Sequence, residues 1–184
     1  MKENRKSEFK LYRLVFTALM AAVVCVATFV RIPLLGSKVH LGNMTGLLAG
    51  LLLGGPAGGI AAGLGSALND VVSGYGLDEC LVTFVSKFVM GLLCGVLAGR
   101  GRSRGRITLA CVAGAFSYVA LYMCKTFLYR RFVYGLPLDA VGAVMLEKLP
   151  ASLINAVFAI VVAPILYAAL RPALERAGLL QKLR

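Results

Sequence analysis

The sequence lacks the residues that most enzymes need. It has no tryptophan, one histidine and eight acidic residues in a chain of 184. A single histidine leaves no second imidazole for a metal site and no base for a nucleophile inside the apolar segments. The chain has no Gly-Lys dipeptide, so the G-x-x-x-x-G-K-[ST] phosphate loop is absent and ATP hydrolysis by that motif is excluded. The carboxylates are too scattered for a metal-dependent transferase. We therefore expect neither an enzyme nor a resident metal or cofactor.

Cysteine is present without a metal-binding or redox pattern. The five cysteines form no C-x-x-C motif, and four of them lie in apolar segments. We interpret them as small apolar packing residues.

Apolar sequence dominates what is present. Apolar residues make up 59% of the chain, mean hydropathy is +0.83, and the charges fall into a few blocks. A soluble domain of this size does not carry so much apolar sequence, whereas each membrane-spanning helix needs about 20 apolar residues. The sequence contains no alternating segments of about ten residues, which a barrel requires. The sequence therefore predicts an all-α, polytopic membrane protein.

The basic residues indicate topology rather than nucleic-acid binding. Of the 20 Lys and Arg residues, 13 lie in three blocks, at 2–13, 100–106 and 171–184, and each block flanks an apolar segment. Such blocks are typical of cytoplasmic loops. The first apolar run, residues 14–30, is longer than a usual signal-peptide core. We expect a retained first helix, with a cleaved signal peptide as the alternative.

The glycine-rich stretch "GNMTGLLAGLLLGGPAGGIAAGLGSALND", residues 42–70, decides the number of helices. If all three basic blocks are cytoplasmic, an even number of spans must separate them, so this stretch must form two short helices. Pro56, among four glycines, is the expected break. We predict one membrane domain over residues 1–184, with both termini cytoplasmic. Its six helices are expected at about 10–31, 40–54, 57–73, 80–99, 107–129 and 143–170.

Small residues recur every fourth position in these segments. Gly46, Gly50, Gly54 and Gly58 form one series, and Ala18 and Ala22 form a pair in the first helix. Residues four apart share one helix face, which lets helices approach closely. Such faces serve internal packing or the docking of another membrane protein.

Polar side chains inside the helices gather toward their outer ends in this topology. They are contributed by several helices, and charged or amide groups in a membrane usually face the bundle interior or a cavity. We therefore expect a solute pocket that opens to the exterior. The alternative is that the two lysines snorkel outward or pair with Asp70 or Glu147. The candidate pocket residues are His40, Asn43, Lys87, Tyr122, Lys125 and Asn155.

The run from His40 to Asp70 resembles the signature region of the substrate-binding S components of energy-coupling factor (ECF) transporters. The resemblance rests on a short polar start, a Gly-rich helix, a Gly-Pro turn and a second Gly-rich helix that ends near Asp or Asn. It implies high-affinity capture and uptake of a vitamin or vitamin precursor at the plasma membrane of a prokaryote. It also implies docking through Ala18 and Ala22 onto a transmembrane coupling (T) component that is carried by two cytoplasmic ATPases. ATP hydrolysis by these partners would then drive toppling of the S component in the membrane.

The sequence departs from this family in having no tryptophan to stack on a ligand. Tyr118 and Tyr122 are available for stacking, or for packing alone. Two lysines suit an acceptor-rich or anionic solute, such as a flavin, a pyridoxine-like ring or a carboxylated vitamin. A stand-alone secondary transporter or channel, or a structural membrane assembly protein, is the alternative function.

Overall fold

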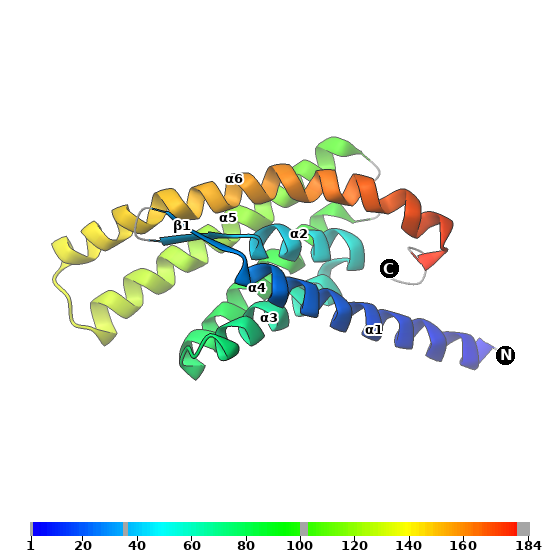
Figure 1. Ribbon diagram of the computed structural model, residues 1–184, viewed down its shortest axis with the longest axis horizontal. Helices are drawn as coiled ribbons and strands as arrows, with labels where there is room; N and C mark the ends of the chain where they lie inside the picture. Colours follow the sequence, from blue (N-terminus) through cyan, green and yellow to red (C-terminus); the bar gives the residue numbers. More distant parts are fainter. Residues whose placement is uncertain (1, 35–36, 100–102, 180–184) are drawn as a thin grey trace.

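The computed structural model describes residues 2–34, 37–99 and 103–179, and helices account for most of them (Figure 1). These ranges contain six α-helices, one short π-helix and a two-stranded hairpin. In chain order the elements are α1 (Lys2–Phe29), β1 (Arg31–Leu34), β2 (Ser37–His40), α2 (Gly42–Leu53), α3 (Gly55–Val72), α4 (Leu77–Ala98), α5 (Arg104–Leu128), η1 (Tyr129–Val133) and α6 (Leu138–Arg176).

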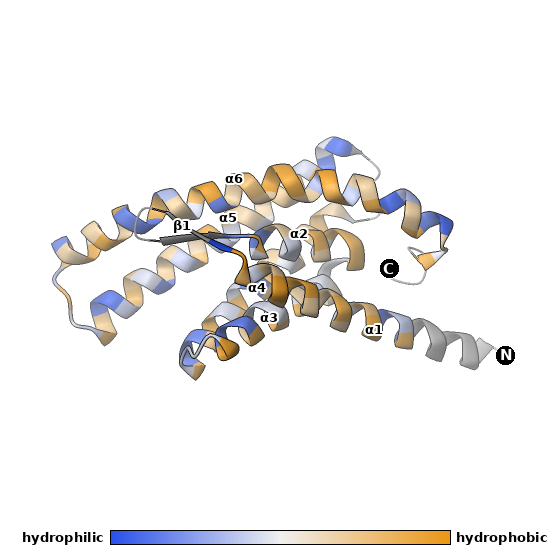
Figure 2. Ribbon diagram, viewed as in Figure 1, coloured by the Kyte–Doolittle hydropathy of each residue, from blue (hydrophilic) through white to orange (hydrophobic). Residues whose placement is uncertain are grey.

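Four of these helices are long and apolar enough to cross a membrane. They comprise Lys10–Phe29, Leu77–Ala98, Arg104–Val133 and Leu138–Arg176, while α2 is apolar but shorter. Figure 2 shows hydrophobic residues along the middle of α6 and hydrophilic residues toward its ends. The prediction of a helical membrane protein is confirmed.

The break in the glycine-rich stretch is present, two residues before Pro56, where it was predicted. Only Gly54 separates α2 from α3, and its φ of 80° lies in the region that favours glycine. Pro56 lies in the first turn of α3 instead of in the turn itself. Proline is tolerated there because the first helical amides have no intrahelical acceptor.

The glycine faces pack internally. α3 lies against α1, α2 and α4. A Cβ atom at Gly91 would lie 2.8 Å from the carbonyl oxygen of Gly58, and one at Gly59 would lie 2.8 Å from that of Phe88. Larger residues would push these helices apart, so the internal-packing interpretation is confirmed for α2, α3 and α4.

A β-hairpin occupies the segment that was expected to be a loop leading into the second helix. β1 and β2 pair in antiparallel register, with Arg31 opposite His40, and α2 begins at Gly42. The prediction that a helix begins at residue 40 is therefore wrong. The backbone amide of His40 donates a hydrogen bond of 2.9 Å to Asn155 Oδ1 on α6, which fixes this residue outside the helix.

α6 extends well beyond its predicted bounds of 143–170. It has 39 residues and continues through Pro150, Pro164 and Pro172. Proline is tolerated inside membrane helices, where neighbouring groups satisfy the freed backbone carbonyls. The long α6 carries one wall of the site over several turns.

Candidate functional site

A cavity of about 560 Å³ lies among α3, α4, α5, η1, α6 and the hairpin. This volume is in the range of small-molecule sites, which hold about 300–1,000 Å³. Its lining is rich in hydrogen-bonding and aromatic groups. The lining residues are Thr28, Arg31, His40, Ser66, Asn69, Asp70, Tyr75, Glu79, Val82, Thr83, Ser86, Lys87, Tyr118, Tyr122, Lys125, Thr126, Tyr129, Arg130, Tyr134, Lys148, Ser152 and Asn155.

Lys87 on α4 provides the most buried charge in this lining, with 2% of its surface exposed. Its ammonium group donates a hydrogen bond to Asn43 Oδ1 on α2 and lies 3.9 Å from the centre of the Tyr118 ring. Amide and ring contacts of this kind stabilise a cation that has lost its water shell. Asn43 does not line the cavity; the structure places it behind Lys87, where it holds the ammonium group.

Tyrosines form one wall of the cavity. Tyr118 and Tyr122 stack on α5 with ring centres 6.1 Å apart and planes 21° apart. They are four residues apart, so they lie on one helix face, and Tyr129 in η1 extends the wall. Flat apolar faces combined with hydroxyl groups suit a planar aromatic solute.

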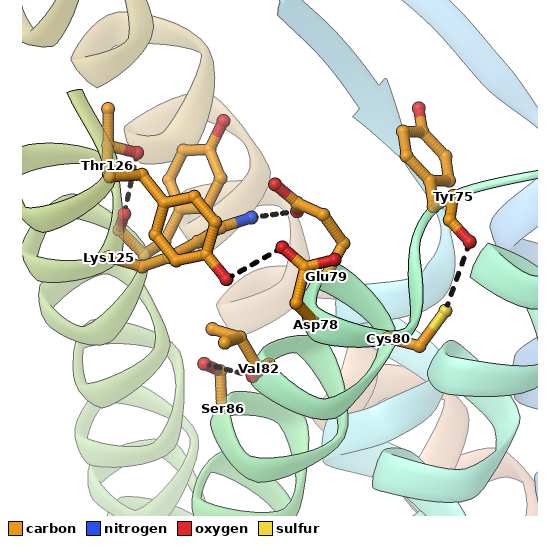
Figure 3. A network of polar contacts seen from close by, with 10 residues as sticks. Tyr75, Asp78, Glu79, Cys80, Val82, Ser86, Lys125 and Thr126 are labelled. Carbon is orange, nitrogen blue, oxygen red and sulfur yellow. Dashed lines mark hydrogen bonds and ion pairs between the residues drawn. The ribbon is translucent and has the colours of Figure 1, made fainter. Parts of the chain in front are cut away.

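Lys125 on α5 closes the side of the cavity toward α4. Its ammonium group forms an ion pair with Glu79, in the first turn of α4 (Figure 3). The hydroxyl of Tyr129 donates a hydrogen bond of 3.0 Å to Asp78, one residue before Glu79. The pairing with Asp70 or Glu147 that the sequence left open is therefore not found; the partner of Lys125 is Glu79.

The hairpin is fastened at both of its outer ends beside the cavity. Arg31 donates hydrogen bonds to Asn69 Oδ1 and, at 2.9 Å, to Ser73 Oγ, both at the C-terminal end of α3. On the other strand, the His40 amide is bound to Asn155 Oδ1, as described above. Side-chain and backbone hydrogen bonds thus tie Arg31 and His40 to α1, to the α3 segment and to α6, and the two strands pair with each other, so the hairpin has a defined position beside the cavity.

His40 is neutral in this setting. Burial, together with the positive charges of Lys87 and Arg31, lowers the pKa of His40 from its ordinary 6.5 to about 3. Its Nδ1 atom accepts a hydrogen bond of 3.2 Å from the amide of Gly42, which requires an unprotonated nitrogen. His40 therefore offers the cavity a neutral imidazole.

Ser66 on α3 has an unsatisfied hydroxyl. The residue is 2% exposed and lines the cavity, and its Oγ has no hydrogen-bond partner among the described residues. An unsatisfied buried polar group costs about 1–3 kcal/mol. A bound molecule that reaches this hydroxyl would remove that cost.

The cavity contains most of the predicted pocket residues and several that the sequence analysis missed. His40, Lys87, Tyr122, Lys125 and Asn155 line it together. Arg31 and Lys148 also line it and were not predicted. Lys148, Ser152 and Asn155 are spaced as one helix face, so a search for polar residues four and seven positions apart would have found Lys148.

Ala18 and Ala22 lie on the opposite side of α1 from the bundle contacts. Both are exposed, while Ala21 and Val24 on the other face are buried. Leu14, Leu19 and the two alanines thus form an apolar, shallow face that is available to lipid or to another membrane protein.

Comparison with known proteins agrees with this architecture. No curated protein matches the sequence. The family model described as "ECF-type riboflavin transporter, S component" matches residues 8–172, which include all of α2 to α5 and most of α1 and α6. The family consists of transporter components, which are not enzymes. The chain thus belongs to the family of ECF-type riboflavin transporter S components.

Proposed function

We propose that the protein captures riboflavin or a closely related flavin from outside the cell and delivers it inward as an S component. One observation carries the proposal: a cavity with a tyrosine wall and many hydrogen-bonding groups, in a chain that belongs to this family. A flavin has a flat, three-ring system edged with nitrogen and oxygen acceptors. Its flat face suits Tyr118 and Tyr122, and its edge suits donors such as Lys87.

The cavity residues have separate roles in this proposal. Tyr122 stacks on the ring system, Lys87 and Lys125 donate to its acceptors, and Asn155 acts together with His40 at the junction of α6 and the hairpin. Asn43 serves as a positioning residue, because it contacts the Lys87 ammonium group rather than the cavity.

The proposed topology has six crossings in one membrane domain, with both termini in the cytoplasm. Two features support it. The start of α1 and the end of α6 lie at the same end of the molecule, and the turn from η1 into α6 lies at the opposite end (Figure 1). The basic blocks at 2–13, 100–106 and 171–184 would then all face the cytoplasm. α2 and α3, at about 18 Å and 27 Å by their 12 and 18 residues, are shorter than a bilayer core and rely on burial in the bundle.

Energy for uptake would come from partner proteins. The sequence lacks the phosphate loop, so we propose that a transmembrane T component and two cytoplasmic ABC ATPases supply ATP hydrolysis. The exposed Ala18 and Ala22 on α1 are the proposed docking face for the T component. The plasma membrane of a prokaryote is the proposed location.

The test is to identify the small molecule that the gently purified protein retains. We expect mass spectrometry to detect a flavin, and we expect added riboflavin to raise the thermal unfolding temperature of ligand-free protein. A panel of vitamins that leaves this temperature unchanged, with no retained molecule, would refute the proposal. Recovery of a T component and two ATPases on co-purification would support the assembly, whereas proton- or sodium-driven uptake by the chain alone would contradict it.

A further inference from the structure

Basic residues outside the three cytoplasmic blocks concentrate in the cavity. Seven of the 20 Lys and Arg residues lie outside these blocks, and five of the seven line the cavity. Among the residues that the structure describes, two carboxylates line it with them, those of Asp70 and Glu79. The five basic residues are Arg31, Lys87, Lys125, Arg130 and Lys148. Positive charge in the membrane or at its outer face runs against the usual distribution of Lys and Arg, so this concentration calls for a physical reason.

Three of the five cations already have partners in the protein. Lys125 is paired with Glu79. Lys87 is held by Asn43 and the Tyr118 ring. Arg31 makes hydrogen bonds to a backbone carbonyl and to neutral side chains that fasten the hairpin.

The other two, Arg130 in η1 and Lys148 on α6, have no carboxylate partner. The guanidinium carbon of Arg130 lies 5.2 Å from the centre of the Tyr134 ring, and this ring is its only described side-chain partner. The ammonium group of Lys148 makes no hydrogen bond or ion pair with the described residues. Both side chains are only partly exposed. No described carboxylate pairs with either of these half-buried cations, so a bound anion that reached them would be stabilised by both charges.

Each cation lies nearer to the η1–α6 turn than the cavity residue on the same helical segment, Tyr122 or Asn155. From Tyr122 to Arg130 there are eight residues, or about 12 Å along the helix axis, and from Asn155 to Lys148 there are seven, or about 10 Å. α5 and α6 are antiparallel neighbours joined through η1, so these two steps run in the same direction, toward the η1–α6 turn. The tyrosine stack and Asn155 thus lie deeper in the cavity than the two cations.

We propose that Arg130 and Lys148 form an anion subsite that binds a phosphate or carboxylate group of the solute. This inference rests on the proposed function and sharpens it. The flat ring lies on Tyr118 and Tyr122, a short chain runs outward, and its terminal anion lies between the guanidinium and ammonium groups. Arg offers two parallel N–H donors that match phosphate or carboxylate geometry, and Lys adds a mobile point charge. The preferred solute is then a phosphorylated flavin rather than uncharged riboflavin.

The test compares riboflavin with riboflavin 5′-monophosphate. Both are titrated into the purified full-length protein in lipid nanodiscs, with flavin fluorescence as the readout. We expect the monophosphate to bind about tenfold more tightly or better, since hydrogen bonds between charged groups are about twice as strong as neutral ones. Equal binding, or tighter binding of riboflavin, overturns the anion subsite and leaves the proposed function intact. If the protein binds neither flavin, the proposed function is refuted, and the subsite for a flavin phosphate is refuted with it.

Substitutions locate the subsite through the ratio of the two dissociation constants. We expect Arg130→Gln and Lys148→Gln each to reduce the ratio of the riboflavin to the monophosphate dissociation constant about fivefold, toward one. We expect Lys148→Arg to preserve this ratio, because it keeps the positive charge. Arg131→Gln is the matched control, because Arg131 is the adjacent cation, is exposed and does not line the cavity. An unchanged ratio in both Gln variants, or an equal fall in the Arg131 control, overturns the assignment to these two residues. Elution of each variant as a single species that still binds riboflavin verifies folding.

Discussion

Replacing Gly58 with alanine tests the close packing of the glycine-rich helices. A Cβ atom at this position would lie 2.8 Å from both the carbonyl oxygen of Ala49 and the amide nitrogen of Gly50, whereas ordinary contact begins at 3.4 Å. The neighbours are backbone atoms of α2, so no side chain can rotate away. The Cα atom of Gly50 would lie nearer still, at 2.5 Å, so α2 and α3 must separate by roughly 0.9 Å at a point where the bundle is otherwise close-packed.

The expected loss of stability follows from two opposing effects. Overpacking costs about 1–3 kcal/mol, and we take about 3 because only backbone can yield. Alanine regains about 1 kcal/mol over glycine in a helix interior. The net loss of about 2 kcal/mol corresponds to a fall in the unfolding temperature of roughly 4–8 °C for a chain of this size.

Thermal unfolding can be followed through the buried thiols of Cys94 and Cys111, which react with a fluorogenic maleimide only when the bundle opens, in protein whose exposed Cys124 and partly exposed Cys25 have first been replaced by serine. Gly142→Ala is the matched control, because Gly142 is also helical but has no atom within 4 Å of its would-be Cβ. We expect this control to keep or raise the unfolding temperature. If Gly58→Ala unfolds at the same temperature as Gly142→Ala, the close-packing argument is wrong.

Three further predictions concern the cavity and the docking face. Lys87→Ala and Asn155→Ala should each weaken flavin binding about tenfold or more, because each removes a hydrogen-bonding group that lines the cavity; unchanged dissociation constants in both would refute the pocket. Ala18→Leu with Ala22→Leu should abolish co-purification with a T component while riboflavin binding persists, and continued co-purification would exclude this face as the docking site. Between pH 3 and 6.5 the unfolded chain binds a proton at His40 that the folded chain does not, so folding stability should fall as the pH drops below 6.5. The His40→Gln variant should show a weaker dependence of stability on pH. An identical pH profile in the variant would contradict the lowered pKa of His40.

The helix pair α2–α3 shows how far sequence reasoning reaches. Charge parity alone required two helices in residues 42–70, and glycine and proline chemistry located the break within two residues of Gly54. The charge count sums over the whole chain, and the glycine and proline preferences act within a few residues, so neither depends on tertiary contacts. The predicted bounds of α6, 143–170, fell short of the observed Leu138–Arg176, because the helix continues through Pro172.

The hairpin could not be predicted in the same way. Its strands have four residues each and carry little periodicity, and they are held by contacts to α3 and α6 that are distant in sequence. Local propensity is a weak guide when such tertiary contacts decide the conformation.

The sequence indicated how far along each helix the candidate site residues lie, but not which way their side chains point. Distance from the helix end grouped Lys87, Lys125 and Asn155 as candidates, because polar residues in a membrane helix avoid lipid, and all three line one cavity. It could not distinguish Asn43, which faces Lys87 behind the cavity, from residues that line it. Nor could it separate Arg130, which lines the cavity, from its exposed neighbour Arg131, since the π-helical turn sets their directions.

The most direct test of the central claim is a binding titration of the purified, ligand-free protein with riboflavin and its 5′-monophosphate, together with a Tyr122→Leu variant. The account predicts saturable binding of one flavin per chain, quenching of flavin fluorescence by the tyrosine stack, and marked weakening in the variant. No saturable binding of either flavin, or binding that the variant leaves unchanged, would contradict the claim that this cavity captures a flavin.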